Sequence, residues 1–485
     1  MAYVLGGSVQ RVGNKIKVTG QLIDARTDRQ VWAKNFENKN LSDNFEIQAE
    51  IAKAIAGELQ AVISPQTARL LDHKPTEISA AYDKFLQARA IRTAGYQAAD
   101  ARERERQLFE EAVIIDPNFA VAWAWLANNN AYAYFLRRSP EHLTRAKDAI
   151  AAAVRIAPDE PDVILNRGYF HYYANRDYSE AVRYFEQVGQ LQPNGAFWRF
   201  ALGTVQRRQG RWSDALVNLR RATQLEPLNA DFSTVFLTAL GATRRYDELR
   251  MEYERRAALV AAPLVNRYQA ARTHFLSRGS AQEAESFFAS LTPDEARLVP
   301  GIRRAWALDR GGSASVEERE QWQQDQTATA NTLALGERAL FFATQGDWAR
   351  NRRWLSSAAA TVRQKIKDDP KVVGTWCQLA QAEALMGIKE EDMRCALEAI
   401  DLIPELLDRT DGMASAATLA FVFSWTGDKD RAIAEYARLP RTPGPHLGAD
   451  INVHVMRRHP TFAPLRGDSR FEALLNDPKN NAPLF

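Results

Sequence analysis

Cysteine is scarce in this sequence, which has only Cys377 and Cys395 among its 485 residues. A disulfide framework is therefore excluded, and one pair without CxxC spacing does not indicate a metal site. We expect both to be small buried residues on opposite helices of one helix pair. No run of about 18 apolar residues occurs either, so the sequence predicts no membrane-spanning helix.

An excess of charge of one sign is also lacking, because 63 basic residues stand against 60 acidic ones, for a net charge of +3. Proteins that bind nucleic acid through bulk charge need positive groups that neutralise phosphates. From this balance we expect no nucleic-acid partner. The chain is too long for one compact core, so several domains or a repeat array are expected.

Catalytic signatures are absent as well, since no GxGxxG, GxxxxGK[ST] or HExxH motif occurs. Gly6-Gly7-Ser8 is interpreted as a bend between strands, because no helix start follows it as a phosphate loop would require. Asp450, His454 and His459 have no further ligand at a suitable spacing, so we interpret the histidines as surface residues. We predict no enzyme, no cofactor and no metal.

Residues 196–227 contain the clearest repeated unit, AFWRFALGTVQRRQGRWSDALVNLRRATQLEP. Two short helical patterns flank Gly210-Arg211-Trp212. Small residues such as Gly203 and Ala215 would let the two helices approach closely, and Leu219 would fill the remaining gap. This unit resembles a tetratricopeptide repeat, whose Leu-Gly, Ala, Ala and Pro positions it matches.

The unit recurs along the chain. The prolines that close successive units are Pro117, Pro158, Pro193, Pro227 and Pro263, and the aromatic residues in the turns are Tyr178, Trp212 and Tyr246. Apart from a longer first interval between prolines, both sets keep close to the family period of about 34 residues. The sequence therefore predicts a mainly α fold, a right-handed superhelical tetratricopeptide solenoid.

The first residues are different, because they alternate polar and apolar side chains. We predict three strands that turn at Gly13-Asn14 and Thr27-Asp28, covered by a helix from Asp43 to about Ile63, which makes a small N-terminal α/β region. The stretch YVLGGSVQRVGNKIKVTGQLIDARTDRQVW, followed by FEIQAEIAKAIA, resembles the C-terminal half of the TolB-like domain. That domain accompanies bacterial class III adenylate cyclases, some protein kinases and membrane-bound winged-helix activators.

The resemblance is confined to these two stretches. The first half of the domain and the cyclase, kinase or winged-helix parts have no counterpart, so none of those activities is carried over. A chain that begins inside a strand is expected to be an excerpt of a larger protein. We predict four parts, namely a partial TolB-like region at 1–64, a linker at 65–75, about nine or ten helix pairs at 76–440 that are irregular around 264–330, and a capping segment at 441–485.

The capping segment contains the phrase HPTFAPLRGDSRFEALL. It resembles the closing segment of many bacterial TolB-like and tetratricopeptide proteins. Its apolar residues would cover the exposed surface of the last repeat, as a solenoid requires.

Candidate binding residues lie on the first helix of each pair, which lines the inner face of such a solenoid. They are Tyr169, Tyr172, Tyr173, Phe200, Arg207 and Arg208. Aromatic rings near arginines suit extended peptides, through stacking and bidentate contacts to carboxylates. Packing between repeats is the alternative interpretation for the tyrosines. The Lys, Asn and Arg positions of the co-chaperone type hold Leu165, Phe200 and Thr234, so that function is not expected.

The prediction is a non-catalytic scaffold that binds a peptide or protein partner through its concave face. One alternative is a sensory or regulatory region of a bacterial signalling protein whose output domain lies upstream. Another is a structural subunit that joins an assembly through the edge of its first strand. The resemblances imply a bacterial protein of the cytoplasm or periplasm and do not choose between them.

Overall fold

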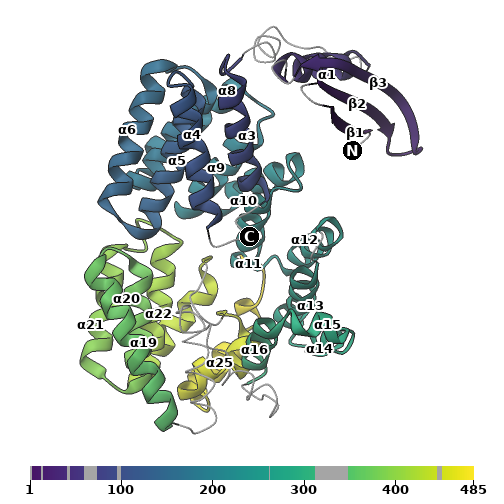
Figure 1. Cartoon of the computed structure of the whole chain (residues 1–485). Coiled ribbons are helices and arrows are strands. Elements are labelled where there is room, and N and C mark those ends of the chain that lie inside the picture. Colours follow the sequence, from purple (N-terminus) through teal and green to yellow (C-terminus); the bar gives the residue numbers. More distant parts are fainter. Residues whose placement is uncertain are drawn as a thin grey trace. The chain divides into compact units, whose positions relative to one another are not determined.

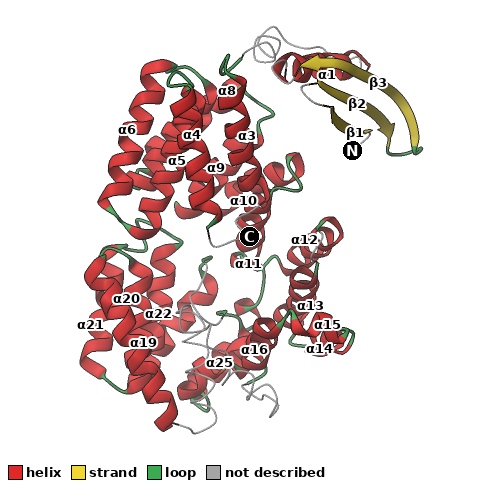
Figure 2. Cartoon of the chain, in the orientation of Figure 1, coloured by secondary structure: helices red, strands yellow, loops and turns green. Residues whose placement is uncertain are grey.

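The computed structural model describes residues 3–12, 15–40, 44–58, 74–94, 100–260, 263–311, 348–444 and 450–485. Helices dominate, with one small sheet near the N-terminus, which confirms the predicted fold class (Figure 1, Figure 2). In this part of the chain no helix has both the length and the apolar character needed to cross a membrane. The predicted turn at Gly13-Asn14, most of the linker 65–75 and the helices expected between 316 and 344 lie outside the described residues.

The sheet is an antiparallel meander in the order β1-β2-β3, formed by Tyr3–Val12, Lys15–Asp24 and Arg29–Asn40. Helix α1, Asn44–Glu58, packs against it, and Leu22, Phe36 and Ile47 are buried there. An ion pair of 3.5 Å between Lys34 Nζ and Glu50 Oε1 joins β3 to α1. The alternation of side chains along the strands therefore separates an α1-covered face from an open one.

Strand β1 continues without interruption through Gly6-Gly7-Ser8, where the sequence suggested a bend between strands. Gly7 pairs with Gly20 of β2. A Cβ atom on Gly7 would lie 2.5 Å from the carbonyl oxygen of Thr19. The glycine is therefore needed for close approach of two strands, and the predicted bend is wrong.

The helices that follow occur in sequence as antiparallel pairs. The first are α3 Ser79–Ala94, α4 Ala101–Ile115, α5 Ala120–Arg137, α6 Pro140–Ile156 and α7 Pro161–Phe170. In α4 the carboxylate of Glu105 is fully buried and accepts a 2.7 Å hydrogen bond from Arg92 Nε and another of 2.7 Å from Asn129 Nδ2. A buried charge is tolerated here because it is paired and hydrogen-bonded.

The next helices keep the predicted register. They are α8 Tyr178–Leu191, α9 Ala196–Arg208, α10 Trp212–Leu225, α11 Ala230–Ala242, α12 Tyr246–Leu259, α13 Leu264–Arg278 and α14 Gln282–Ala289, and a π-helical turn, His171–Asn175, extends α7. A Cβ atom on Gly203 would lie 2.8 Å from Leu219 Cγ. The small residue of the repeat pattern thus sets the distance between α9 and α10.

The remaining elements include a short helix that the sequence did not suggest, α15 Pro293–Arg297. The others are α16 Pro300–Asp309, α19 Trp348–Asp368, α20 Val373–Met386, α21 Lys389–Leu402, α22 Asp411–Thr426, α23 Lys429–Arg438, α24 Val453–Arg458 and α25 Ser469–Asn476, with 3-10 turns at Leu439–Arg441, Pro460–Leu465 and Pro478–Asn480. Cys377 on α20 and Cys395 on α21 are free and buried, as predicted.

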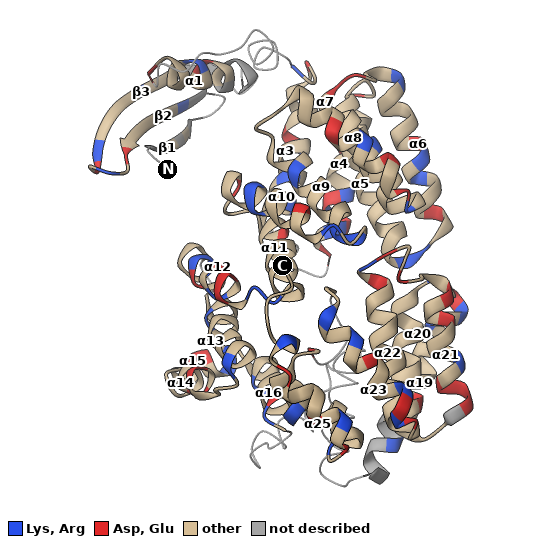
Figure 3. Ribbon diagram, turned by 180° about the vertical axis from the view of Figure 1, so that it is seen from behind, with Lys and Arg blue, Asp and Glu red and all other residues tan. Residues whose placement is uncertain are grey.

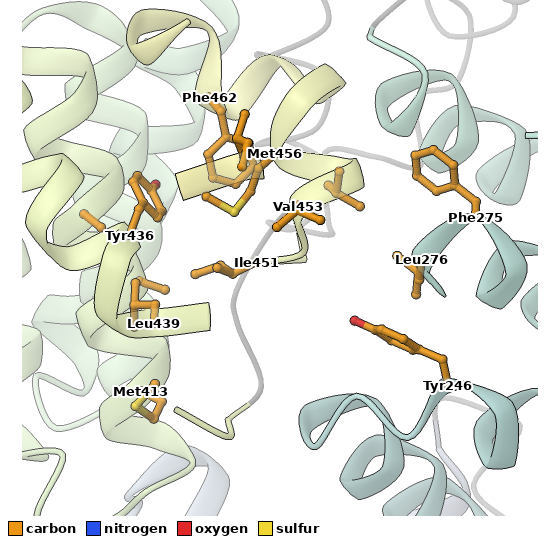
Figure 4. Packing of buried hydrophobic residues seen from close by; sticks show 14 of the residues in the cluster. Tyr246, Phe275, Leu276, Met413, Tyr436, Leu439, Ile451, Val453, Met456 and Phe462 are labelled. Atoms are coloured by element: carbon orange, nitrogen blue, oxygen red, sulfur yellow. The ribbon is translucent and has the colours of Figure 1, made fainter. Parts of the chain in front are cut away.

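The described residues fall into two compact units, which we treat separately. The second unit contains Ala131–Thr144 and Arg167–Phe485, and all the groups discussed below belong to it. One apolar core of this unit is built from segments far apart in the sequence (Figure 4). Residues of the C-terminal segment, among them Ile451, Met456 and Phe462, fill the space between α22–α23 and α12–α13.

The C-terminal segment is therefore more than a cover for the last repeat. His454 and His459, which we expected at the surface, are also partly or fully buried by this packing. His459 is only 6% exposed, and its Nδ1 accepts a hydrogen bond of 3.3 Å from the Thr461 amide. His454 is half-buried against Phe275. The surface interpretation is wrong for His459, because the segment packs against two helical layers instead of one.

Candidate functional site

The predicted binding residues differ in accessibility. Four are buried, namely Tyr169, Tyr172, Arg207 and Arg208, and two are half-buried, namely Tyr173 and Phe200. Tyr173 stacks on Tyr169 with ring centroids 5.6 Å apart, and Phe200 stacks on Phe232 at 4.5 Å. The accessible part of this set thus consists of two rings that are held in place by a second ring each.

Arg208 and Tyr172 belong to a polar network around the carboxylate of Asp408, which is completely buried. Arg208 Nε donates to the Tyr172 hydroxyl at 2.6 Å, and Arg208 Nη1 donates to Asp408 Oδ2 at 2.6 Å. The same carboxylate oxygen accepts hydrogen bonds from Tyr178 Oη at 2.6 Å and from Arg176 Nη1 at 2.9 Å. We call these five residues the Asp408 network.

The other oxygen of Asp408 holds the start of α22. It accepts hydrogen bonds from the backbone N–H groups of Thr410 at 2.8 Å and Asp411 at 3.1 Å. Nearby, the Arg409 amide donates to the carbonyl of Arg208 at 2.8 Å. Burial alone would raise the pKa of Asp408, but Arg208, the Tyr178 hydroxyl and the Thr410 amide together hold that pKa below its usual value. The carboxylate is therefore ionised and joins the turns around α8 and α9 to the turn before α22.

As contacts for a partner, the six residues remain a prediction. In the structure Tyr172 and Arg208 point at groups of their own chain, and the Phe135 ring lies 4.9 Å from the Arg208 guanidinium. Arg207 is 8% exposed, and its Nε has no hydrogen-bond partner among the described residues. Burial, with a contribution from the neighbouring Arg208 charge, lowers the pKa of Arg207.

Arg176 and Arg244 occupy a backbone conformation that normally favours glycine, which Arg138 also adopts, with φ 54°. Arg176 has φ 53° and Arg244 has φ 55°, at turns equivalent to the one where Gly210 has φ 79°. The left-handed conformation costs a residue with a side chain roughly 1 kcal/mol or more. We did not single out these arginines from the sequence, although each lies one repeat period from Gly210 and just before a turn aromatic, Tyr178 or Tyr246. That spacing was the signal that could have found them.

Arg244 lines a cavity of about 210 Å³ between α11, α12 and α13 on one side and Thr442, Gly444 and residues 450–452 on the other. Its side chain is 5% exposed, and its Nη1 has no hydrogen-bond partner in the part of the chain that the structure describes. Leu237, Leu249 and Leu276 supply apolar wall. The lining of the cavity therefore combines leucine side chains with a buried cation and other polar groups.

Two other polar residues of this cavity, Asn452 and Arg272, have partners. Asn452 Nδ2 lies 2.8 Å from the Tyr246 hydroxyl and from the Leu276 carbonyl oxygen, to which it donates. Arg272 donates to Asp309 and to Asp450, at 2.7 Å in each case. Arg272 thus has two carboxylates, whereas no ion pair to Arg244 is found among the described residues.

One group resembles a set of metal ligands among the described residues. Glu383, Glu391 and Cys395 place one potential ligand atom each within 4.8 Å of one another. Arg363 forms an ion pair with Glu383, and Arg394 forms one with Glu391. Burial, reinforced by the Glu383 charge, raises the pKa of the Cys395 thiol to about 12, so the thiol is protonated. This group is better described as an ion-pair cluster, because a metal would need the thiolate and would compete with two guanidinium groups.

Comparisons with known proteins give short or distant matches. No protein-family model matches the chain. The chain is 29% identical over 163 residues to a protein of Rhizobium meliloti (strain 1021) named "Putative adenylate cyclase 3", and the match covers 33% of this chain and 27% of that protein. The chain thus spans about a quarter of the length of this relative.

Similar solved structures include PilW, a type IV pilus biogenesis factor, with a TM-score of 0.32 and 19% identity over 45% of this chain and 98% of that chain. Another is the human IFIT1 dimer with m7Gppp-AAAA, with a TM-score of 0.36 and 15% identity over 74% of this chain and 77% of that chain.

The expectation of no nucleic-acid partner is wrong as an exclusion, because IFIT1 is seen in complex with capped oligonucleotides. Net charge is a sum over the whole chain, whereas binding depends on local potential. Acidic and basic residues are mixed along the helices (Figure 3). A balance near zero therefore says nothing about any single patch of the surface.

Proposed function

We propose that this chain is a non-catalytic interaction scaffold that binds a peptide or protein partner on the first helices of its repeats. We also propose that the chain consists of four parts, with boundaries near Ser64, Pro75 and Pro440. The part before Ser64 is proposed to be related to the TolB-like domain. The helical pairs supply a large, regular surface on which rigid side chains can be displayed.

The observation that carries the proposal is the state of Tyr173 and Phe200. Each ring keeps accessible surface, and each is held by stacking on a neighbour, Tyr169 or Phe232. A ring fixed in this way loses little conformational entropy when a partner packs on it, which is the property of aromatic anchors at interfaces. The Asp408 network also supports Tyr173, because the Tyr172 ring packs against the Tyr173 ring with centroids 4.6 Å apart.

The test is selection of peptides from a random display library on the purified chain, followed by fluorescence anisotropy with each selected peptide. We expect Tyr173→Ala with Phe200→Ala to weaken binding at least about 10-fold, or about 1.4 kcal/mol. The matched control replaces Val217 and Leu228 by alanine, since these are exposed by 61% and 62% and lie on other elements. Peptides that bind the double variant as tightly as the wild type would contradict the proposal.

A second candidate function rests on the match to the adenylate cyclase relative. We propose, as that alternative, a regulatory region that accompanies a signalling output domain. The experiment adds this chain to the purified catalytic part of the Rhizobium meliloti relative and measures its cyclase activity. A dose-dependent change would favour regulation, and unchanged activity at saturating concentration would count against it.

A further inference from the structure

We propose that the cavity at Arg244 binds a carboxylate carried on a short apolar body, with the carboxylate paired to the Arg244 guanidinium. This inference goes beyond the scaffold function, because it concerns a small ligand and a different part of the repeats. The site lies where α11, α12 and α13 face Thr442, Gly444 and residues 450–452.

The first step is the state of the Arg244 charge. The residue is only 5% exposed, its Nη1 has no hydrogen-bond partner, and no ion pair to Arg244 is found in the described ranges. Burial lowers the pKa of Arg244, and of the neighbouring groups only the Tyr246 side chain acts in the opposite direction. A buried cation without a counter-ion is costly, so an anion that reaches it would be stabilised strongly.

The second step is the backbone. Arg244 adopts φ 55°, whereas the equivalent turn between α9 and α10 uses Gly210. The same unfavourable choice at Arg176 is explained by its hydrogen bonds to Asp408 and Asp411. Arg138, with φ 54°, places its guanidinium over the Tyr134 and Phe135 rings. Arg244 Nη1 has no partner among the described residues, so the strain at Arg244 suggests a role in binding a ligand. A bound anion would give Arg244 the partner that Arg176 already has.

The third step is the rest of the lining. Tyr246 and Tyr253 both contribute to the cavity wall, and burial raises the pKa of each hydroxyl to about 12. Both hydroxyls are therefore protonated at neutral pH and can donate. Tyr246 accepts a hydrogen bond from Asn452, which leaves its own proton available for a ligand oxygen.

Size and charge define the class of ligand. A cavity of about 210 Å³ has room for a molecule of about four to six carbon atoms, since one water takes roughly 30 Å³. Its leucine walls suit an apolar body. Asp450, which pairs with Arg272, already places one negative charge in the lining. A singly charged carboxylate therefore fits better than a doubly charged phosphate.

The experiment uses sodium butyrate and sodium hexanoate as probes and butyramide as the uncharged control. Isothermal titration calorimetry and thermal unfolding are measured on the full chain, on Arg244→Gln and on the matched control Arg245→Gln. Arg245 is the next residue but pairs with the half-buried Glu248, at 3.1 Å. We expect the acids to bind the wild type and Arg245→Gln, butyramide to bind neither, and Arg244→Gln to lose at least about 10-fold in affinity.

A second arm distinguishes a free acid from a carboxylate on a peptide. A short peptide ending in leucine is compared with its C-terminal amide on the same variants. If Arg244→Gln does not fold, Thr238→Trp decides, because Thr238 is exposed at the rim of the cavity and the change would obstruct entry while leaving Arg244 in place. The proposal is overturned if neither butyrate nor hexanoate binds, or if the amides bind as well as the acids. It is also overturned if Arg244→Gln and Thr238→Trp bind the acids as tightly as the wild type. Because Tyr173 and Phe200 are untouched, this outcome is independent of the peptide selection.

Discussion

Replacing Asp408 by asparagine removes one negative charge from the centre of the Asp408 network while keeping its shape. The wild-type carboxylate is fully buried and accepts hydrogen bonds from Arg176, Tyr178 and Arg208 at 2.9, 2.6 and 2.6 Å. Removing one partner of a buried ion pair typically costs about 3 to 5 kcal/mol. Asp411 still contacts both arginines and is 31% exposed, so we expect the lower end, about 3 kcal/mol.

The assay is urea unfolding followed by circular dichroism, combined with hydrogen exchange at the Arg409 amide. That amide donates to the Arg208 carbonyl, so it reports directly on the junction. We expect Asp408→Asn to lower the free energy of unfolding and to speed exchange at Arg409. The control is Asp430→Asn, because the Asp430 side chain is 84% exposed in its pair with Arg470 and should change stability by less than about 1 kcal/mol.

A double-mutant cycle sharpens the test. Arg208→Met and Asp408→Asn should be less than additive, with a coupling of at least about 1 kcal/mol, because each removes the same contact. The reasoning is refuted if Asp408→Asn stays within about 0.5 kcal/mol of the wild type, which is the range of neutral surface changes, or if the two effects simply add.

Three further predictions concern other parts of the fold. Burial lowers the pKa of His459 from 6.5 to about 3, so the unfolded chain binds the proton first, and the free energy of unfolding should fall by up to about 5 kcal/mol as pH drops from about 6.5 towards 3. His459→Asn should flatten this dependence when unfolding is measured across that pH range. Gly203→Ala should destabilise by about 1 to 3 kcal/mol in thermal unfolding, because its Cβ would lie 2.8 Å from Leu219, whereas Gly374→Ala, with no atom within 4 Å, should not. Cys377 and Cys395 should resist a thiol reagent until the protein is denatured, since both are buried with raised pKa, and fast labelling of the native chain would contradict this.

Local pattern explains why the helices were predictable. The regular spacing of the turn aromatics and the small residue at Gly203 act within one pair, where neighbours in sequence are neighbours in space. The three strands were predictable for the same reason, since alternation and a turn at Thr27-Asp28 are short-range signals. Gly6-Gly7 was misinterpreted because a glycine that permits close approach and a glycine that bends a strand look alike in sequence.

The sequence by itself determined the helical pairs, their register and the small sheet, because these depend on hydrophobic periodicity and on residues a few positions apart. Only the tertiary structure decided what happens between distant segments. It placed Arg208 on Asp408, which lies far along the chain from it, and it buried His459 between two layers of helices. It also left Arg244 without an ion pair in the described residues, in a cavity that no local sequence pattern predicts. Ion pairs and cavities of this kind form where segments distant in sequence pack together, and such long-range contacts produce no periodic pattern in the sequence.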